Sequence, residues 1–278
     1  MNIPKPLRPW AWCGVWLIII WSGLVVLDRT AWLLPDGQNP QAQTDRFLQL
    51  LADFNADSGP PIKILALGDS ILSASLSDSE DFSGVLDGNM KLLPLYSGAA
   101  RWTHFAALMS EFRSTKPQLI IVQDSLLQKT SLRPTALESA LLNARRLAAS
   151  YIRSTRNKLI PQDIPFTLRQ WQAIKRSEYS ASIPIAPEAL EFLAELQAVS
   201  NAVVVIHLPR SLAVEPVPET TNWIKHLQSK LEPMNIPVIV LGGPLPNDHY
   251  DRDQVHPNDQ GRVVRRKQFR DFVREQLP

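Results

Sequence analysis

Residues 62–76 read IKILALGDSILSASL, a mostly apolar run that stops at a polar turn and then resumes. Residues 62–67 have the length of a strand without apolar–polar alternation, which is typical of strands buried on both faces of a parallel sheet. Gly68, Asp69 and Ser70 form the turn, and the apolar spacing after them predicts a helix. Ser70 is therefore either a reactive hydroxyl at the end of a strand or an ordinary helix cap.

Four further runs of similar length and composition follow along the chain. They are KLLPLY (91–96), QLIIVQ (118–123), AVVVIHL (202–208) and IPVIVL (236–241). Segments with helical spacing separate or follow these runs, at residues 103–114, 187–200, 221–233 and 261–277. Because strands and helices alternate, residues 62–278 are predicted to form a flavodoxin-like three-layer α/β/α domain with a five-stranded, mostly parallel sheet.

The interval between the third and fourth predicted strands is too long for a simple crossover helix. Within it, residues 141–180 hold eight Lys or Arg side chains against Asp163 and Glu178. We expect a helical insertion over about residues 130–190. It is either a basic cap that contacts an anionic or sugar-bearing substrate, an envelope protein or anionic lipid, or a solvated helical face.

The N-terminal region contains a long uncharged stretch. Residues 9–27, PWAWCGVWLIIIWSGLVVL, approach the roughly 20 residues needed to cross a hydrocarbon core, so they predict a transmembrane helix within an anchor of residues 1–32. Lys5 and Arg8 precede the stretch and favour a cytoplasmic N-terminus, which places the domain on the extracytoplasmic, periplasmic side. A cleaved signal peptide and a buried core helix are the alternatives. Residues 33–61 predict a polar linker and a short helix.

The composition excludes several classes of function. The chain has 278 residues, 45% of them hydrophobic, which is enough to bury a core. Its 29 basic and 27 acidic residues leave a net charge of +2, so nothing at this level indicates nucleic acid binding. A single cysteine, Cys13, excludes an internal disulfide and a cysteine-based zinc site. The sequence contains neither a phosphate-binding glycine loop nor a dinucleotide fingerprint, and we expect no cofactor and no metal.

A serine hydroxyl is a poor nucleophile unless a base takes its proton and a third group orients that base. The segment DHYDRDQVHPNDQGR (248–262) supplies both, because Asp253 and His256 lie three residues apart between the fifth predicted strand and the last helix. The carboxylate can accept a hydrogen bond from Nδ1 of the imidazole, which leaves Nε2 to face the serine. The sequence therefore predicts a catalytic set of Ser70, His256 and Asp253.

The pairing of LALGDSIL with DQVHPNDQG resembles the SGNH, or GDSL-type, hydrolase superfamily. The resemblance implies that Ser70 is the nucleophile, His256 the general base and Asp253 the residue that orients it. It also implies that the backbone N–H groups of Ser70 and of Gly98, in LYSGAARW (95–102), form an oxyanion hole.

The third family block departs from this pattern. Family members have Gly-x-Asn-Asp after the third strand, where the asparagine is a further oxyanion donor, but this chain reads IIVQDSLLQK (120–129). Gln123 or Ser125 could contact the substrate instead. His207 closes the fourth predicted strand, so it either lines the substrate pocket or is a structural histidine.

The resemblance and the predicted anchor together imply a membrane-anchored, extracytoplasmic serine esterase. Its expected substrate is an acyl ester, in particular an O-acetyl ester, of a cell-envelope polysaccharide or lipid. A polysaccharide O-acetyltransferase would use the same triad. A non-catalytic module of an envelope or polysaccharide-export complex is the third possibility.

Overall fold

A computed structural model describes most of the chain from residue 40 onward. The described residues are 12, 13, 16, 17, 19, 22, 40–57, 62–76, 85–86, 89–98, 100–128, 185–212, 214–215, 217–251 and 254–277. The chain divides into two compact units, residues 1–43 with 130–165 and residues 44–129 with 166–278. The fold described below is that of the second unit.

A parallel sheet forms the centre of this unit. Its strands are β1 (Ile62–Gly68), β2 (Val85–Leu86), β3 (Met90–Tyr96), β4 (Leu119–Gln123), β5 (Ala202–His207) and β6 (Val238–Val240), and their order is β2-β3-β1-β4-β5-β6. All neighbours pair in parallel except β2, a two-residue edge strand that runs antiparallel to β3. The predicted five-stranded parallel sheet is confirmed, and β2 is an addition that the sequence did not predict.

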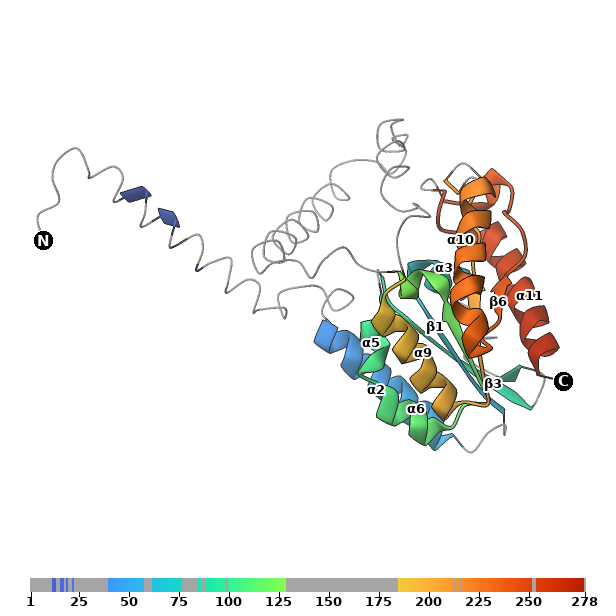
Figure 1. Cartoon of the computed structure of the whole chain (residues 1–278), viewed down its shortest axis with the longest axis horizontal. Helices are drawn as coiled ribbons and strands as arrows, with labels where there is room; N and C mark the ends of the chain where they lie inside the picture. Colours follow the sequence, from blue (N-terminus) through green and yellow to red (C-terminus); the bar gives the residue numbers. More distant parts are fainter. Residues whose placement is uncertain are drawn as a thin grey trace, which may run out of the picture. The chain divides into compact units, whose positions relative to one another are not determined.

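Two groups of helices cover the two faces of the sheet (Figure 1). On one face, alternate side chains such as Leu65 and Leu67 pack against α2 (Pro40–Ala56), α5 (Trp102–Ala106), α6 (Met109–Thr115), α9 (Pro187–Val199) and α10 (Val217–Leu231). On the other, Ile64 and Ala66 pack against α3 (Ser70–Leu76) and α11 (Asp259–Gln276). Both faces of the sheet are therefore buried under helices, which explains why the strand sequences are continuously apolar.

Two predicted elements differ in detail from the structure. The helix predicted over 103–114 is two short helices, because Leu108 leaves the helical conformation with φ −104° and ψ 11°. Phe105, Leu108 and Phe112 are all fully buried, so the break keeps both halves in contact with the core. The fifth predicted strand, 236–241, shortens to three residues in β6, because Pro237 has no N–H to donate to the sheet.

Two predicted regions fall largely outside the described residues. The insertion over about 130–190 lies outside them as far as residue 184, and its last residues belong to α9. Of residues 9–27 only six are described, and they are helical with exposed side chains. Within the described part of the chain, no helix has both the length and the apolar character needed to span a membrane.

Candidate active site

The topology places Ser70 where ligands bind in sheets of this kind. The chain moves from β1 to β3 on one side and then crosses to β4 on the other, so the strand order reverses next to β1. In open α/β sheets, ligands bind outside the carboxyl ends of the strands at such a reversal. β1 ends at Gly68, and Ser70 is the first residue of α3.

The turn that carries Ser70 depends on close packing at Gly68. A Cβ atom at this position would overlap Cβ and Cδ2 of Leu72 and would lie 2.7 Å from Oε1 of Gln123. Only glycine leaves room for both the helix and the side chain from β4. The next residue, Asp69, accepts a hydrogen bond of 2.8 Å from the N–H of Ile71 and so caps the first turn of α3.

Ser70 and His256, which are 186 positions apart in the chain, lie within hydrogen-bond distance. Nε2 of the imidazole is 3.0 Å from Oγ of the serine, and both residues are half-buried. This distance lies within the range of a nucleophile and its general base, and a substrate can still reach the pair from solvent. The structure thus brings together the first two residues of the predicted triad, while Asp253 lies outside the described residues.

A tight loop before α11 presents His256. The N–H of Asp251 donates to the carbonyl of His256 at 2.8 Å, and the N–H of Gln254 donates to the carbonyl of Asp251 at 2.8 Å. Gln254 has a φ of 59°, in the left-handed region that side chains seldom adopt. Its amide compensates by donating to the carbonyls of Asn247 and Asp251. The loop conformation is therefore held by its own hydrogen bonds.

The predicted oxyanion donors lie on neighbouring strand ends. The N–H of Ser97 donates to the carbonyl of Gly68 at 3.4 Å, which brings the turn with Gly98 alongside the turn with Ser70. Within the described residues, the N–H groups of Ser70 and Gly98 make no hydrogen bond. Gly98 is exposed, and a Cβ there would meet nothing within 4 Å. Two N–H groups are thus available at this edge of the sheet.

Gln123 and Ser125 hold Asp69, and their polar atoms are used within the protein. The Gln123 amide accepts from the N–H of Asp69 at 3.0 Å and donates to its Oδ1 at 2.9 Å. The hydroxyl of Ser125 donates to Oδ2 of Asp69 at 2.7 Å. All three side chains are buried. We name this set, Asp69 with Gln123 and Ser125, the Asp69 clamp.

His207 lies at the centre of a buried ionic cluster. Its Nδ1 donates to Asp124 at 2.7 Å and its Nε2 to Glu215 at 2.6 Å, and all three side chains are almost fully buried. Burial alone would lower the pKa of the imidazole, but the two carboxylates outweigh it and raise this pKa to about 10. The pKa values of Asp124 and Glu215 are lowered by the same contacts, against the effect of burial. The cluster is therefore a cation between two anions at neutral pH.

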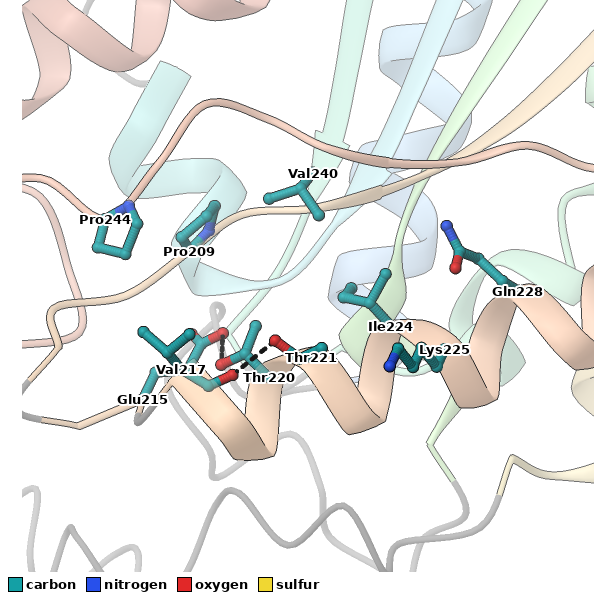
Figure 2. A pocket seen from close by; sticks show the side chains of 10 residues that line it. All are labelled: Pro209, Glu215, Val217, Thr220, Thr221, Ile224, Lys225, Gln228, Val240 and Pro244. Carbon is teal, nitrogen blue, oxygen red and sulfur yellow. Dashed lines mark hydrogen bonds between the residues drawn. The ribbon is translucent and has the colours of Figure 1, made fainter.

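A cavity of about 330 Å³ is lined in part by Glu215 of this cluster (Figure 2). Val217, Ile224 and Val240 supply much of its apolar wall. Glu215 and its hydrogen-bond donor Thr220 also line the cavity. Neither Ser70 nor His256 belongs to its lining. The cavity is therefore separate from the Ser70–His256 pair.

The polar side chains around the site include several that the sequence did not predict as functional. Asp124 directly follows a predicted strand and Asp69 lies two residues after the end of another, and that position at the carboxyl edge was an available signal. Glu215 carried no such signal, because it lies in a loop of irregular sequence. As for metals, no group of three or more His, Cys, Asp or Glu within the described residues is arranged to hold one.

No protein-family model matches the chain, and no curated protein matches it either. Among solved structures, it is similar to a family two carbohydrate esterase from Clostridium thermocellum, in complex with cellohexaose, with a TM-score of 0.40 and 8% identity. An acetyl xylan esterase (Est2A) from the rumen bacterium Butyrivibrio proteoclasticus has a TM-score of 0.40 and 14% identity.

These likenesses cover 80% and 78% of this chain but only 66% and 64% of the two esterases. The chain thus spans about two thirds of the length of either. At this level of similarity, the likeness carries no conclusion about activity.

Proposed function

We propose that the protein is a serine ester hydrolase in which Ser70 attacks the acyl carbon and His256 acts as general base. The observation that carries this proposal is the 3.0 Å contact between Nε2 of His256 and Oγ of Ser70 at the strand reversal. A helix cap needs no imidazole beside its hydroxyl. A histidine brought from the far end of the chain to within hydrogen-bond distance of a half-buried serine supports an activated nucleophile.

The reaction follows the usual order for such a pair. Nε2 of His256 takes the proton of Ser70 as Oγ bonds to the carbonyl carbon, and the carbonyl oxygen becomes an oxyanion. The N–H groups of Ser70 and Gly98 are available to stabilise this charge. The imidazolium then protonates the leaving alkoxide, and water releases the acyl group from Ser70 by the reverse sequence. Asp253, three residues before His256, is the proposed partner of Nδ1.

The proposed substrate is an acyl ester, in particular an O-acetyl ester, of a cell-envelope polysaccharide or lipid. The uncharged stretch 9–27 supports this choice, because an anchored extracytoplasmic domain would encounter envelope polymers.

Expression of the full chain and of a variant lacking residues 1–32 tests the anchor. We expect the full chain to stay with the membrane fraction after an alkaline carbonate wash and the shortened variant to be released; release of both would contradict the anchor.

Labelling of the full-length protein with a fluorophosphonate probe tests the nucleophile. We expect Ser70→Ala to abolish labelling and His256→Ala to slow it by roughly 10²–10⁴-fold, the usual contribution of a general base. Ser73→Ala is the matched control, because Ser73 lies in the same helix and is also half-buried. Labelling that persists in the Ser70 variant, or a folded wild-type protein that stays unlabelled, would favour a non-catalytic module instead.

An acyltransferase would use the same two residues, Ser70 and His256. The two reactions differ only in what removes the acyl group from Ser70, which is water in a hydrolase and a sugar hydroxyl in a transferase. A chromogenic acetyl ester, supplied with and without an acceptor glycan, separates the two reactions. We expect release of acetate at the same rate under both conditions. Acetylated glycan without free acetate would identify a transferase.

A further inference from the structure

We propose that His207 is a positioning residue for Ser70, although it is fully buried and touches no substrate. The inference rests on the proposed function, because it concerns the reactivity of Ser70. It is carried by two sets of buried hydrogen bonds, from the imidazole to Asp124 and from Gln123 and Ser125 to Asp69, which the backbone at the end of β4 joins, because Asp124 lies between Gln123 and Ser125.

The last link in this series is the Asp69 clamp. Asp69 immediately precedes Ser70, and its carboxylate receives hydrogen bonds from Ile71, Gln123 and Ser125. The first of these donors belongs to the nucleophile's own helix, the second is the last residue of β4, and the third lies in the turn that follows β4. The clamp therefore fixes the direction in which α3 leaves the sheet, and with it the position of Oγ of Ser70.

The middle link is the short turn after β4. Asp124 stands between Gln123 and Ser125 and begins a 3-10 helix of four residues, η4 (Asp124–Leu127). So short a turn has little intrinsic stability. Oδ2 of Asp124 accepts from Nδ1 of His207 and from Nε1 of Trp223, each at 2.7 Å. Because these two donors hold Asp124, they also position its neighbours in the clamp, Gln123 and Ser125.

The first link is the imidazole itself. His207 is the last residue of β5, and it donates through both ring nitrogens, to Asp124 on one side and to Glu215 on the other. A neutral imidazole has a single N–H, so only the charged form satisfies both carboxylates. Glu215 is also held by Thr220 at 2.8 Å and by the N–H of Arg210 at 3.0 Å. The imidazole is thereby anchored on the side away from the active site.

The two carboxylates of His207 provide a matched comparison. Both are buried and both bond the same ring, but only Asp124 lies next to the Asp69 clamp. His207→Gln removes the imidazole from both Asp124 and Glu215, whereas Glu215→Gln alters only the side away from the clamp. Both variants should be less stable than the wild type. In variants that are both folded, a purely structural role predicts little effect of either one on Ser70, and a positioning role predicts a clear effect in His207→Gln only.

The experiment measures the rate constant for fluorophosphonate labelling of full-length variants, at a temperature where circular dichroism shows each one folded. Because small misplacements of reacting groups are costly, we expect His207→Gln to slow labelling by about tenfold or more and Glu215→Gln by less than about threefold. Equal slowing in both variants, or unchanged labelling in His207→Gln, overturns the inference.

Two further measurements apply if His207→Gln does not fold or if the wild-type protein does not react with the probe. If His207→Gln does not fold, Ser125→Ala tests the next link, and we expect slower labelling at a temperature where circular dichroism shows the variant folded. Its control is Ser75→Ala, which removes a buried hydroxyl that has no hydrogen-bond partner within the described residues. Equal labelling in these two serine variants would overturn the inference.

Amide hydrogen exchange of residues 69–73 separates the inference from the proposed function, because it needs no activity. Faster exchange in His207→Gln than in Glu215→Gln supports positioning of the turn, even if the wild-type protein proves unreactive and the proposed function fails. Equal exchange in the two variants overturns it.

Discussion

At the level of single residues, Gly68 and Gly98 differ in how much space surrounds them, although the resemblance to a hydrolase family implies a catalytic role only for the second. Gly68 is enclosed by Leu72 and Gln123, whereas Gly98 faces open space. Neither has a positive φ, so conformational freedom does not distinguish them. The difference is one of packing.

Gly68→Ala should therefore destabilise the protein, by about 1–3 kcal/mol or more, because a methyl group is forced into a filled space. Gly98→Ala, the matched control, should change the free energy of unfolding by less than about 0.5 kcal/mol. Urea unfolding followed by circular dichroism measures both. Similar values for the two variants would show that the packing at Gly68 can relax.

The His207 cluster makes stability depend on pH in the alkaline range. The pKa of His207 is raised from 6.5 to about 10 in the folded state, so between these pH values the folded protein binds one proton more than the unfolded chain. The free energy of unfolding should then fall as pH rises, by about 1.4 kcal/mol per pH unit from this group. Asp124 and Glu215, with lowered pKa values, act in the acidic range, where their contribution is lost as pH falls.

Urea unfolding at pH 7, 8 and 9 tests this dependence. In His207→Gln the decline over this range should be clearly shallower than in the wild type, because the titrating group is gone. Parallel curves for the two proteins would mean that His207 is neutral in the folded state.

At the level of elements, the N-terminus of α11 determines where His256 stands. The side chain of Asn258 accepts from the N–H groups of Gln260 and Gly261 and donates to the carbonyls of Asp248 and Tyr250. It thus joins the helix cap to the preceding loop, two residues after His256. Gly261 allows this approach, because a Cβ there would overlap the carbonyl oxygen of His249.

Asn258→Ala should cost about 1–2 kcal/mol of stability through loss of the cap. It should also lower kcat for a chromogenic ester with little change in KM, because the base moves and not the binding surface. Gln260→Ala, at an exposed position in the same first turn, is the control. A fall in stability with full kcat would show that the loop holds His256 without the cap.

At the level of the whole unit, Arg265 joins three segments that meet at the carboxyl edge of the sheet. Its guanidinium lies in α11 and donates to the carbonyls of Pro209 at 2.6 Å and Leu241 at 2.9 Å, which follow β5 and β6. It also donates to the hydroxyl of Tyr250 at 3.1 Å. Burial lowers the pKa of this guanidinium, and the contact with Tyr250 opposes that effect.

Arg265→Met keeps the bulk of the side chain but removes the guanidinium donor of the Leu241 carbonyl and leaves the Pro209 carbonyl with the Tyr250 hydroxyl alone. We expect it to lower the free energy of unfolding by about 2–4 kcal/mol. Arg274→Met, in the exposed last turn of the same helix, should change it by less than about 0.5 kcal/mol. Thermal and urea unfolding of both variants checks this; equal stability would mean that water replaces the guanidinium.

Much of the architecture follows from local patterns. The continuously apolar runs at 62–67, 118–123 and 202–208 predicted strands that are buried on both faces, and the structure has β1, β4 and β5 there. The same alternation predicted that the turn at Ser70 and the loop at His256 share one edge of the sheet. Such inferences succeed because periodicity reports burial, and parallel order fixes which strand ends meet.

The partners of the polar side chains required the tertiary structure. Nothing near Gln123 indicates that its amide faces Asp69, 54 positions away, or that His207 bonds Asp124, 83 positions away, and Glu215 as well. A buried charge must find a partner somewhere in the fold, but local sequence does not specify which one. Composition and spacing therefore account for the layers and for the meeting of Ser70 with His256. The folded chain alone selects the buried contacts that hold them, because those depend on distances between segments far apart in sequence.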